Sequence, residues 1–201
     1  MTATYKTDDS FFYVVAPMRC AYSPWFVYKW FFHDGVGRFR AVRDQEAEES
    51  KFTLADIEDL YPGVKSIGLV MDPWARAVYA YKEVIDPKKP ESYRDRVKSN
   101  YPGIDLSSFS KFIMSLTKFP MLPQRHWLYN GDRPVDYLLR VEHINEDFKP
   151  IQDYFCSSVP LGLKDYDIGY KSYFTKSTRE IIQKIFAEDI DSFGYQFKDG
   201  K

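Results

Sequence analysis

The sequence has few cysteines, no long apolar run and no excess of charge of one sign. Its two cysteines, Cys20 and Cys156, are too few for a disulfide framework, so we expect free thiols in a reducing compartment, with a single bridge as the alternative. No stretch approaches the roughly 20 apolar residues that cross a bilayer, and the first ten residues lack the apolar core of a signal peptide. We therefore expect no membrane segment and a cytoplasmic protein, or a virion component if the chain is viral.

The charges nearly balance, with 28 Lys and Arg against 29 Asp and Glu. A general nucleic-acid binder needs a surplus of cations to neutralise phosphates, so this balance argues against nucleic acid as a partner, although a local basic pocket stays compatible with it. The length of 201 residues suits one domain with a sizeable core, and no repeat or low-complexity linker interrupts the chain. We predict a single domain over residues 1–201.

Aromatic residues are abundant, with 16 Tyr, 16 Phe and 4 Trp. The simpler interpretation is a core filled with rings in place of aliphatic side chains. The alternative is that some rings form a surface that stacks on sugars or contacts a partner protein, since aromatic residues are enriched at interfaces. Composition does not separate the two interpretations.

The chain is organised around a predicted strand, turn and helix over residues 67–82. An apolar run from Ile67 to Met71 predicts a buried strand. Asp72 and Pro73 end it, because the residue before proline avoids the helical region while proline suits the first helical turn. The helix that follows has one apolar face, at i, i+3, i+4 and i+7, formed by Trp74, Ala77, Val78 and Tyr81. A ligand of such a unit binds at the carboxyl end of the strand.

Other segments predict further strands and helices. Apolar runs predict strands over residues 11–16 and 137–141. Ser23 begins a predicted helix, and Thr53 with Asp56 resembles the cap of a short one. A further helix is predicted over residues 106–116, and another is predicted to begin at Asn145 as its N-cap. A capping box of Ser177 with Glu180 predicts the last helix, whose apolar stripe is Ile181, Ile182, Ile185 and Phe186.

Three segments resemble sulfotransferases of the carbohydrate type. Residues 71–81 keep that family's Asp-Pro, the following Arg as Arg76, and the aromatic helix. Residues 124–148 resemble its Gln-x-x-Trp element and the strand that ends in Arg-x-Glu, and residues 170–175 and 187–197 resemble its tyrosine-rich and Phe-Gly-Tyr-x-Phe segments. The resemblance implies an α/β fold in three layers, a mainly parallel sheet flanked by helices of the P-loop NTPase-like sulfotransferase type, in a compact bacterial or phage-like member.

The resemblance also implies a reaction, in which a sulfuryl group passes from 3′-phosphoadenosine 5′-phosphosulfate to a hydroxyl of a carbohydrate or other small acceptor, without a metal. The donor would bind at the ends of two strands, where helix amino termini favour anions. The candidate donor-binding residues are Arg19, Ala21, Tyr22, Ser23, Asp72, Arg76 and Tyr79.

The chain departs from the family at three donor positions. Met71 and Tyr79 replace the Arg and Ser that hold the 3′-phosphate, and Met18 replaces the Lys beside the leaving group. A thioether is only a weak acceptor and does not replace a cation. Two hypotheses follow: a divergent transferase that recruits Arg19, Lys29, Arg76 or Arg140, or a binding or structural module of a larger assembly that has lost the donor.

His126 and Glu142 are the candidate catalytic bases of the transferase hypothesis, because a base near the acceptor hydroxyl assists transfer. Each candidate also has a structural interpretation. His126 would be a hydrogen-bonding histidine of the fold, and Glu142 a partner for a backbone N–H or an arginine near the end of a strand. Arg76 would form a buried ion pair that holds its helix.

Overall fold

The computed structural model describes residues 2–6, 12–17, 54–60, 62–63, 65–118, 122–152 and 169–197. The contacts divide the chain into two compact units. Unit 1 comprises residues 1–71 and 124–166, and unit 2 comprises residues 72–123 and 167–201. Each unit is described by itself.

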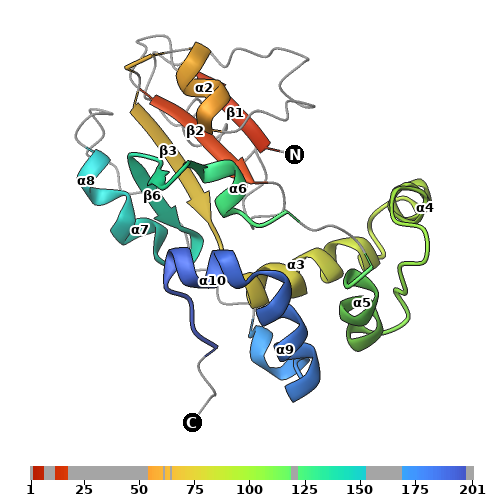
Figure 1. The fold of residues 1–201 in the computed structure, drawn as a ribbon. Helices are drawn as coiled ribbons and strands as arrows, with labels where there is room; N and C mark the ends of the chain where they lie inside the picture. The colour runs from red at the N-terminus through yellow and green to blue at the C-terminus, as the bar shows by residue number, and fades with distance from the viewer. Residues whose placement is uncertain are drawn as a thin grey trace. The chain divides into compact units, whose positions relative to one another are not determined.

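Unit 1 contains a four-stranded sheet of β1 (Thr2–Lys6), β2 (Phe12–Pro17), β3 (Lys65–Val70) and β6 (Tyr137–Arg140), in the order β1-β2-β3-β6 (Figure 1). β3 pairs in parallel with β2 and with β6, while β1 runs antiparallel to β2. From Ser66 to Val70 every residue of β3 is buried, as expected for a central parallel strand. The three predicted strands are confirmed within two residues, and the structure is a mixed α/β one.

Short helices and a hairpin complete the described part of unit 1. They are α2 (Leu54–Leu60), α6 (Arg125–Leu128), β4 (Tyr129–Asn130), β5 (Arg133–Pro134), η1 (Val141–His143), α7 (Ile144–Asp147) and α8 (Lys149–Gln152). The N-cap predicted at Asn145 is wrong, because a 3-10 turn follows β6 directly and α7 already begins at Ile144, with His143 as its N-cap.

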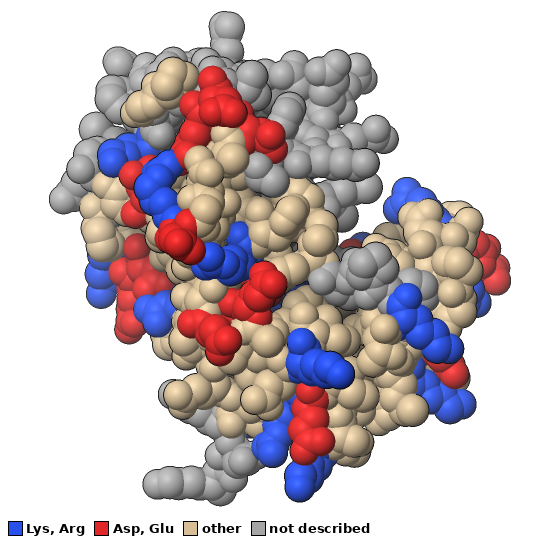
Figure 2. Space-filling view, in the orientation of Figure 1, with Lys and Arg blue, Asp and Glu red and all other residues tan. Residues whose placement is uncertain are grey.

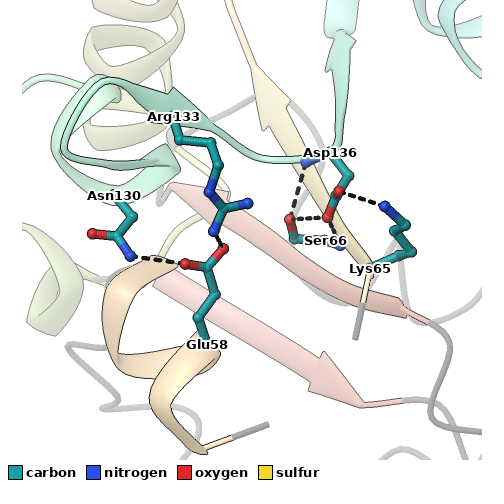
Figure 3. A network of polar contacts seen from close by, with 6 residues as sticks. All are labelled: Glu58, Lys65, Ser66, Asn130, Arg133 and Asp136. Atoms are coloured by element: carbon teal, nitrogen blue, oxygen red, sulfur yellow. Dashed lines mark hydrogen bonds and ion pairs between the residues drawn. The ribbon is translucent and has the colours of Figure 1, made fainter. Parts of the chain in front are cut away.

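Polar side chains fix the start of β6 against β3 (Figure 3). The Asp136 carboxylate accepts hydrogen bonds from the backbone N–H and hydroxyl of Ser66 at 2.9 and 3.0 Å, and from the Lys65 ammonium at 2.8 Å. The Ser66 hydroxyl accepts in turn from the Asp136 N–H at 3.0 Å. In the same view the Glu58 carboxylate of α2 binds Asn130 and Arg133 of the hairpin. These contacts set the register of two segments that lie about seventy positions apart in the sequence.

Gly68 allows close packing against β3. A β-carbon at this position would lie 2.8 Å from Leu128 Cδ2 and 2.8 Å from Val135 Cγ2. Gly68→Ala should therefore overpack the core and lower the free energy of unfolding by about 1–3 kcal/mol, measured by urea denaturation. In the Val135→Ala background the same change should cost less, because two of the crowding methyl groups are gone. Equal costs in both backgrounds would contradict this packing.

Unit 2 is helical in its described residues. It contains α3 (Pro73–Ile85), α4 (Glu91–Asn100), α5 (Phe109–Leu116), η3 (Tyr170–Tyr173), α9 (Lys176–Ile185) and α10 (Ala187–Phe193). The predicted apolar face of α3 is confirmed and is buried in a core with residues of α5 and α9, whose largest members are Trp74, Tyr81, Phe109, Phe112, Ile182 and Phe186. The predicted helix over residues 106–116 is confirmed from Phe109 onward, with Ser108 as its N-cap.

The capping box predicted from Ser177 and Glu180 is wrong. The Thr175 hydroxyl accepts from the Thr178 N–H at 3.3 Å, and the Thr178 hydroxyl accepts from the Thr175 N–H at 3.0 Å. This reciprocal pair caps α9 two residues earlier than expected. Both residues carry a hydroxyl, so a box of two threonines replaces the usual hydroxyl and carboxylate.

Rings fill the core of unit 2. Phe109 makes edge contacts with Tyr81, Tyr173 and Phe174, with centroids 5.0–5.5 Å apart. Such pairs contribute about 0.5–1.5 kcal/mol beyond the area they bury. The packing agrees with the interpretation that rings replace aliphatic side chains in the core. On the face drawn in Figure 2, acidic and basic side chains are interspersed over the described residues. None of the described helices is both long and apolar enough to cross a membrane.

Candidate functional site

Asp72, the first residue of unit 2 and a predicted donor-binding residue, is the N-cap of helix α3. One oxygen of the Asp72 carboxylate, Oδ1, accepts hydrogen bonds from the N–H groups of Trp74 at 2.8 Å and Ala75 at 3.0 Å. Pro73 occupies the first helical position, where its missing N–H costs nothing. The predicted Asp-Pro helix start is therefore confirmed, and the side chain of Asp72 caps the helix.

The second oxygen of Asp72 is also bound. The Tyr170 hydroxyl donates to Asp72 Oδ2 at 3.0 Å, across 98 positions of sequence. The carboxylate thus accepts from two backbone N–H groups and one phenol, and only 7% of the residue is exposed. The negative charge at this end of the helix dipole is supplied by the protein itself.

Burial raises the pKa of the Asp72 carboxyl above its ordinary value, against the opposing effect of the Ala75 N–H, the Tyr170 hydroxyl and the Trp74 N–H. The folded chain therefore takes up the proton at a higher pH than the unfolded chain does. The resulting stabilisation is complete below the ordinary pKa of an aspartate, about 3.9, and is lost as the pH rises through the raised value.

Asp72→Asn should remove this pH dependence, because asparagine is also a good N-cap but does not titrate. Between pH 7 and pH 4 the free energy of unfolding of the wild type should rise relative to that of the variant, by about 1.4 kcal/mol for each unit of pKa difference. Urea denaturation of both proteins over this range measures the effect. If the free energies of unfolding of the two proteins changed in parallel with pH, burial would not raise the pKa of Asp72.

Arg76, another predicted donor-binding residue, lies one turn into α3. Its Nη1 is 3.9 Å from Oδ2 of Asp189 in α10, with 11% of the Arg76 side chain and none of the Asp189 side chain exposed. The guanidinium also lies over the Phe186 ring, 5.5 Å from its centroid. This geometry is that of the buried ion pair considered above. Tyr79, the third candidate on this helix, is half-buried in α3.

Met71 is the last residue of the first of the two stretches of chain that make up unit 1. Its side chain is fully buried. Both of its backbone groups bind the side chain of Gln124: the Met71 N–H donates to Oε1 at 3.0 Å, and Nε2 donates to the Met71 carbonyl at 2.8 Å. Gln124 is itself fully buried. The amide thus extends the pairing of β3 by one residue beyond its end.

Sequence reasoning missed this role of Gln124. The residue opens the Gln-x-x-Trp element, and that pattern by itself indicates no contact with Met71. The available signal was a glutamine followed three residues later by the apolar pair Trp127 and Leu128, since a buried amide needs hydrogen-bond partners.

Arg140, a candidate replacement cation, ends β6 in unit 1. Its guanidinium donates to both oxygens of Asp147, from Nε at 2.9 Å and from Nη2 at 2.7 Å, and the Arg140 N–H donates to the same carboxylate at 2.8 Å. Although burial opposes it, this arginine holds the pKa of Asp147 below its ordinary value. A bidentate pair of this kind is strong and fixes the direction of both side chains.

The two candidate bases lie in unit 1, whereas Asp72, Arg76 and Tyr79 belong to unit 2. His126 is exposed on α6, and its ring makes an edge contact with Trp127 at 4.7 Å between centroids. Glu142 is half-buried in η1, directly after β6 and thus near the carboxyl end of a parallel strand. That edge is where ligands of parallel sheets bind.

The remaining candidates, Arg19, Ala21, Tyr22 and Ser23, lie outside the described residues, as do Met18, Lys29 and both cysteines. Within the described parts of the chain, no three His, Cys, Asp or Glu side chains gather in a way that could hold a metal ion. Comparison of the chain with models of protein families, with curated proteins and with solved structures finds no match.

Proposed function

We propose that this chain has the three-layer, P-loop-like fold of the sulfotransferases and acts as a non-catalytic binding or structural module built on that fold. The observation that carries the proposal is the environment of Met71. At the position of the family's phosphate-binding arginine, this residue offers a buried thioether, and both of its backbone groups are bound to Gln124.

The loss of charge at this position has a large effect on donor affinity. Phosphate recognition depends on charge-assisted hydrogen bonds, each of which contributes about 1.5–3 kcal/mol. With Met71 and Tyr79 in place of the arginine and serine, two such contacts are absent. Their loss corresponds to roughly 10²- to 10⁴-fold weaker binding of the donor.

Two of the cations that the transferase hypothesis recruits are already engaged by carboxylates. Arg76 pairs with the fully buried Asp189, and Arg140 forms the bidentate pair with Asp147. Moving Arg76 to a phosphate would break this buried ion pair, at a cost of about 3–5 kcal/mol. The pairs favour a structural role for both arginines.

The second candidate function is the transferase itself, with 3′-phosphoadenosine 5′-phosphosulfate as donor and a carbohydrate or small hydroxyl compound as acceptor. The observation in its favour is local: β3 ends at Val70, Asp72 caps the next helix and Arg76 follows one turn later, as the family's frame requires. In this hypothesis Arg19 and Lys29 supply the missing charge, and His126 or Glu142 is the base.

Calorimetric titration with 3′-phosphoadenosine 5′-phosphate separates the two candidates. The binding module should give no saturable heat with up to 1 mM nucleotide. Micromolar binding, abolished by Arg19→Ala with Lys29→Ala and kept by Arg96→Ala on the exposed face of α4, would overturn it in favour of the transferase. A sulfotransferase of known activity, titrated in parallel, shows that the ligand is competent.

A further inference from the structure

Asn130 lies at the tip of the hairpin of unit 1, directly before Gly131. Because Asn130 pairs with Arg133, the hairpin joins β4 to β5 through a two-residue loop of Gly131 and Asp132. Gly131 has φ of 60°, the left-handed conformation that a glycine adopts readily as the first residue of such a loop. Both Asn130 and Gly131 are exposed, so water reaches the peptide bond between them.

An exposed asparagine before a glycine is chemically reactive. The backbone nitrogen of the glycine loses its proton and attacks Cγ of the asparagine. The Cγ–Nδ2 bond breaks, ammonia leaves, and a succinimide ring forms. Water then opens the ring: cleavage of the bond to Cγ gives aspartate, and cleavage of the bond to the main-chain carbon gives isoaspartate. A β-carbon on the second residue hinders the attack, and a glycine has none.

The side chain of Asn130 connects the hairpin to α2 (Figure 3). Its Nδ2 donates to Glu58 Oε2 at 2.8 Å, and Glu58 Oε1 accepts from Arg133 Nη2. Only 22% of the Glu58 side chain is exposed, so the carboxylate is held between the two segments. An amide bound in this way is less free to turn its Cγ toward the Gly131 nitrogen. The contact with Glu58 should therefore slow the reaction.

The products of the reaction do not keep this contact. The amide of Asn130 donates to Glu58, whereas an ionised carboxylate only accepts. Two carboxylates would then face each other where one hydrogen bond had been, and like charges at such a distance repel. Arg133 would offset part of the repulsion, because it already pairs with Glu58. An isoaspartate would in addition lengthen the backbone of β4 at a position that pairs with β5.

We propose that Asn130 is a site of spontaneous deamidation, and that its products weaken the contact of α2 with the hairpin. The reactants are the chain itself and water, and the leaving group is ammonia. The reaction is faster at higher pH, because the attacking nitrogen has to lose its proton. The inference is independent of the proposed function, since it involves neither the sulfate donor nor an acceptor.

The test is incubation of the full chain at 37 °C, at pH 7.4 and at pH 9, followed by mass spectrometry of its peptides. The peptide that contains Asn130 should gain the mass that separates O from NH, and faster at pH 9. Asn100 is the internal control, because it is exposed on α4 but precedes Tyr101. Glu58→Ala should speed the reaction of Asn130 several-fold. Equal rates at Asn130 and Asn100 would overturn the site, and an unchanged rate in Glu58→Ala would overturn the protective role of Glu58.

A second measurement tests the consequence for the fold. Asn130→Asp imitates the aspartate product and should lower the urea midpoint of unfolding at pH 7. In the Glu58→Gln background the same change should lower the midpoint much less, because the glutamine amide can donate to the new carboxylate. Equal decreases in both backgrounds, or no decrease in either, would show that the new charge does not act on Glu58 and would overturn this part of the proposal.

Discussion

Replacing Arg76 with methionine should lower the free energy of unfolding by about 3–5 kcal/mol. The reason is Asp189, whose side chain is fully buried and whose ion pair with Arg76 is lost in the variant. Methionine keeps much of the length of the arginine stem but lacks the guanidinium, which pairs with Asp189 and lies over the Phe186 ring, so the loss reports on the charge. Urea denaturation at pH 7 measures it.

The double variant Arg76→Met with Asp189→Leu is the matched control. Because it removes both charges together, it should be markedly more stable than Arg76→Met alone, since replacing a whole buried pair by apolar side chains is often neutral. Arg96→Met, on the exposed face of α4, should change stability by no more than about 0.5 kcal/mol. Additive costs of the Arg76 and Asp189 changes would show that the two side chains do not interact.

The same variant bears on function. If Arg76 held a donor phosphate, its replacement would abolish nucleotide affinity while changing stability little. If Arg76 instead forms a structural ion pair, its replacement should lower the free energy of unfolding strongly, and neither the wild type nor the variant should bind the nucleotide. Measuring both quantities on Arg76→Met therefore separates a ligand-binding arginine from a structural one.

Gln124→Leu should lower the free energy of unfolding by about 2–6 kcal/mol. The substitution keeps the side chain close in size and apolar, but it leaves the N–H and carbonyl of the buried Met71 without the two hydrogen bonds that Gln124 makes. A buried backbone group deprived of its partner costs about 1–3 kcal/mol. Because both groups of one residue are affected, the two costs combine.

Gln183→Leu is the matched control, because the same chemical change on the exposed face of α9 should cost no more than about 0.5 kcal/mol. Gln124→Glu gives a second control. Its carboxylate can still accept from the Met71 N–H but donates to the Met71 carbonyl only when protonated, so its deficit should shrink on acidification. Similar costs for Gln124→Leu and Gln183→Leu would mean that the buried amide makes no such pair of bonds.

The elements that the sequence predicts well are those whose information is local. The apolar run from Ile67 to Met71, the Asp-Pro pair and the apolar face of α3 lie within one stretch of chain. The structure has all three, with β3 ending one residue before the predicted end, at Val70. The N-caps predicted at Asn145 and Ser177 each lie two residues after the N-caps of the structure, His143 and Thr175. At α9 several neighbouring hydroxyl side chains are each capable of capping, so small differences in backbone geometry decide among them.

The contacts that define the candidate site join residues that are far apart in the sequence, and no local sequence pattern indicates them. Tyr170 reaches Asp72 across 98 positions, and Gln124 reaches Met71 across 53. Asp189 lies in a segment whose sequence shows only an acidic first turn of a helix. Periodicity identified the face of α3 that is buried, but it did not identify the side chains from other segments that bind its polar residues.

The position of β3 in the sheet has a consequence for synthesis of the chain. Its parallel neighbour β6 begins seventy positions later, as the pairing of Ser66 with Asp136 shows. At about 5–20 residues per second, the ribosome needs roughly 4–14 s to add that stretch. During this interval the edge of β3 that later binds β6 is unpaired. An unpaired apolar edge can form hydrogen bonds with strands of other chains. Newly made protein should therefore depend on chaperones until β6 has been translated.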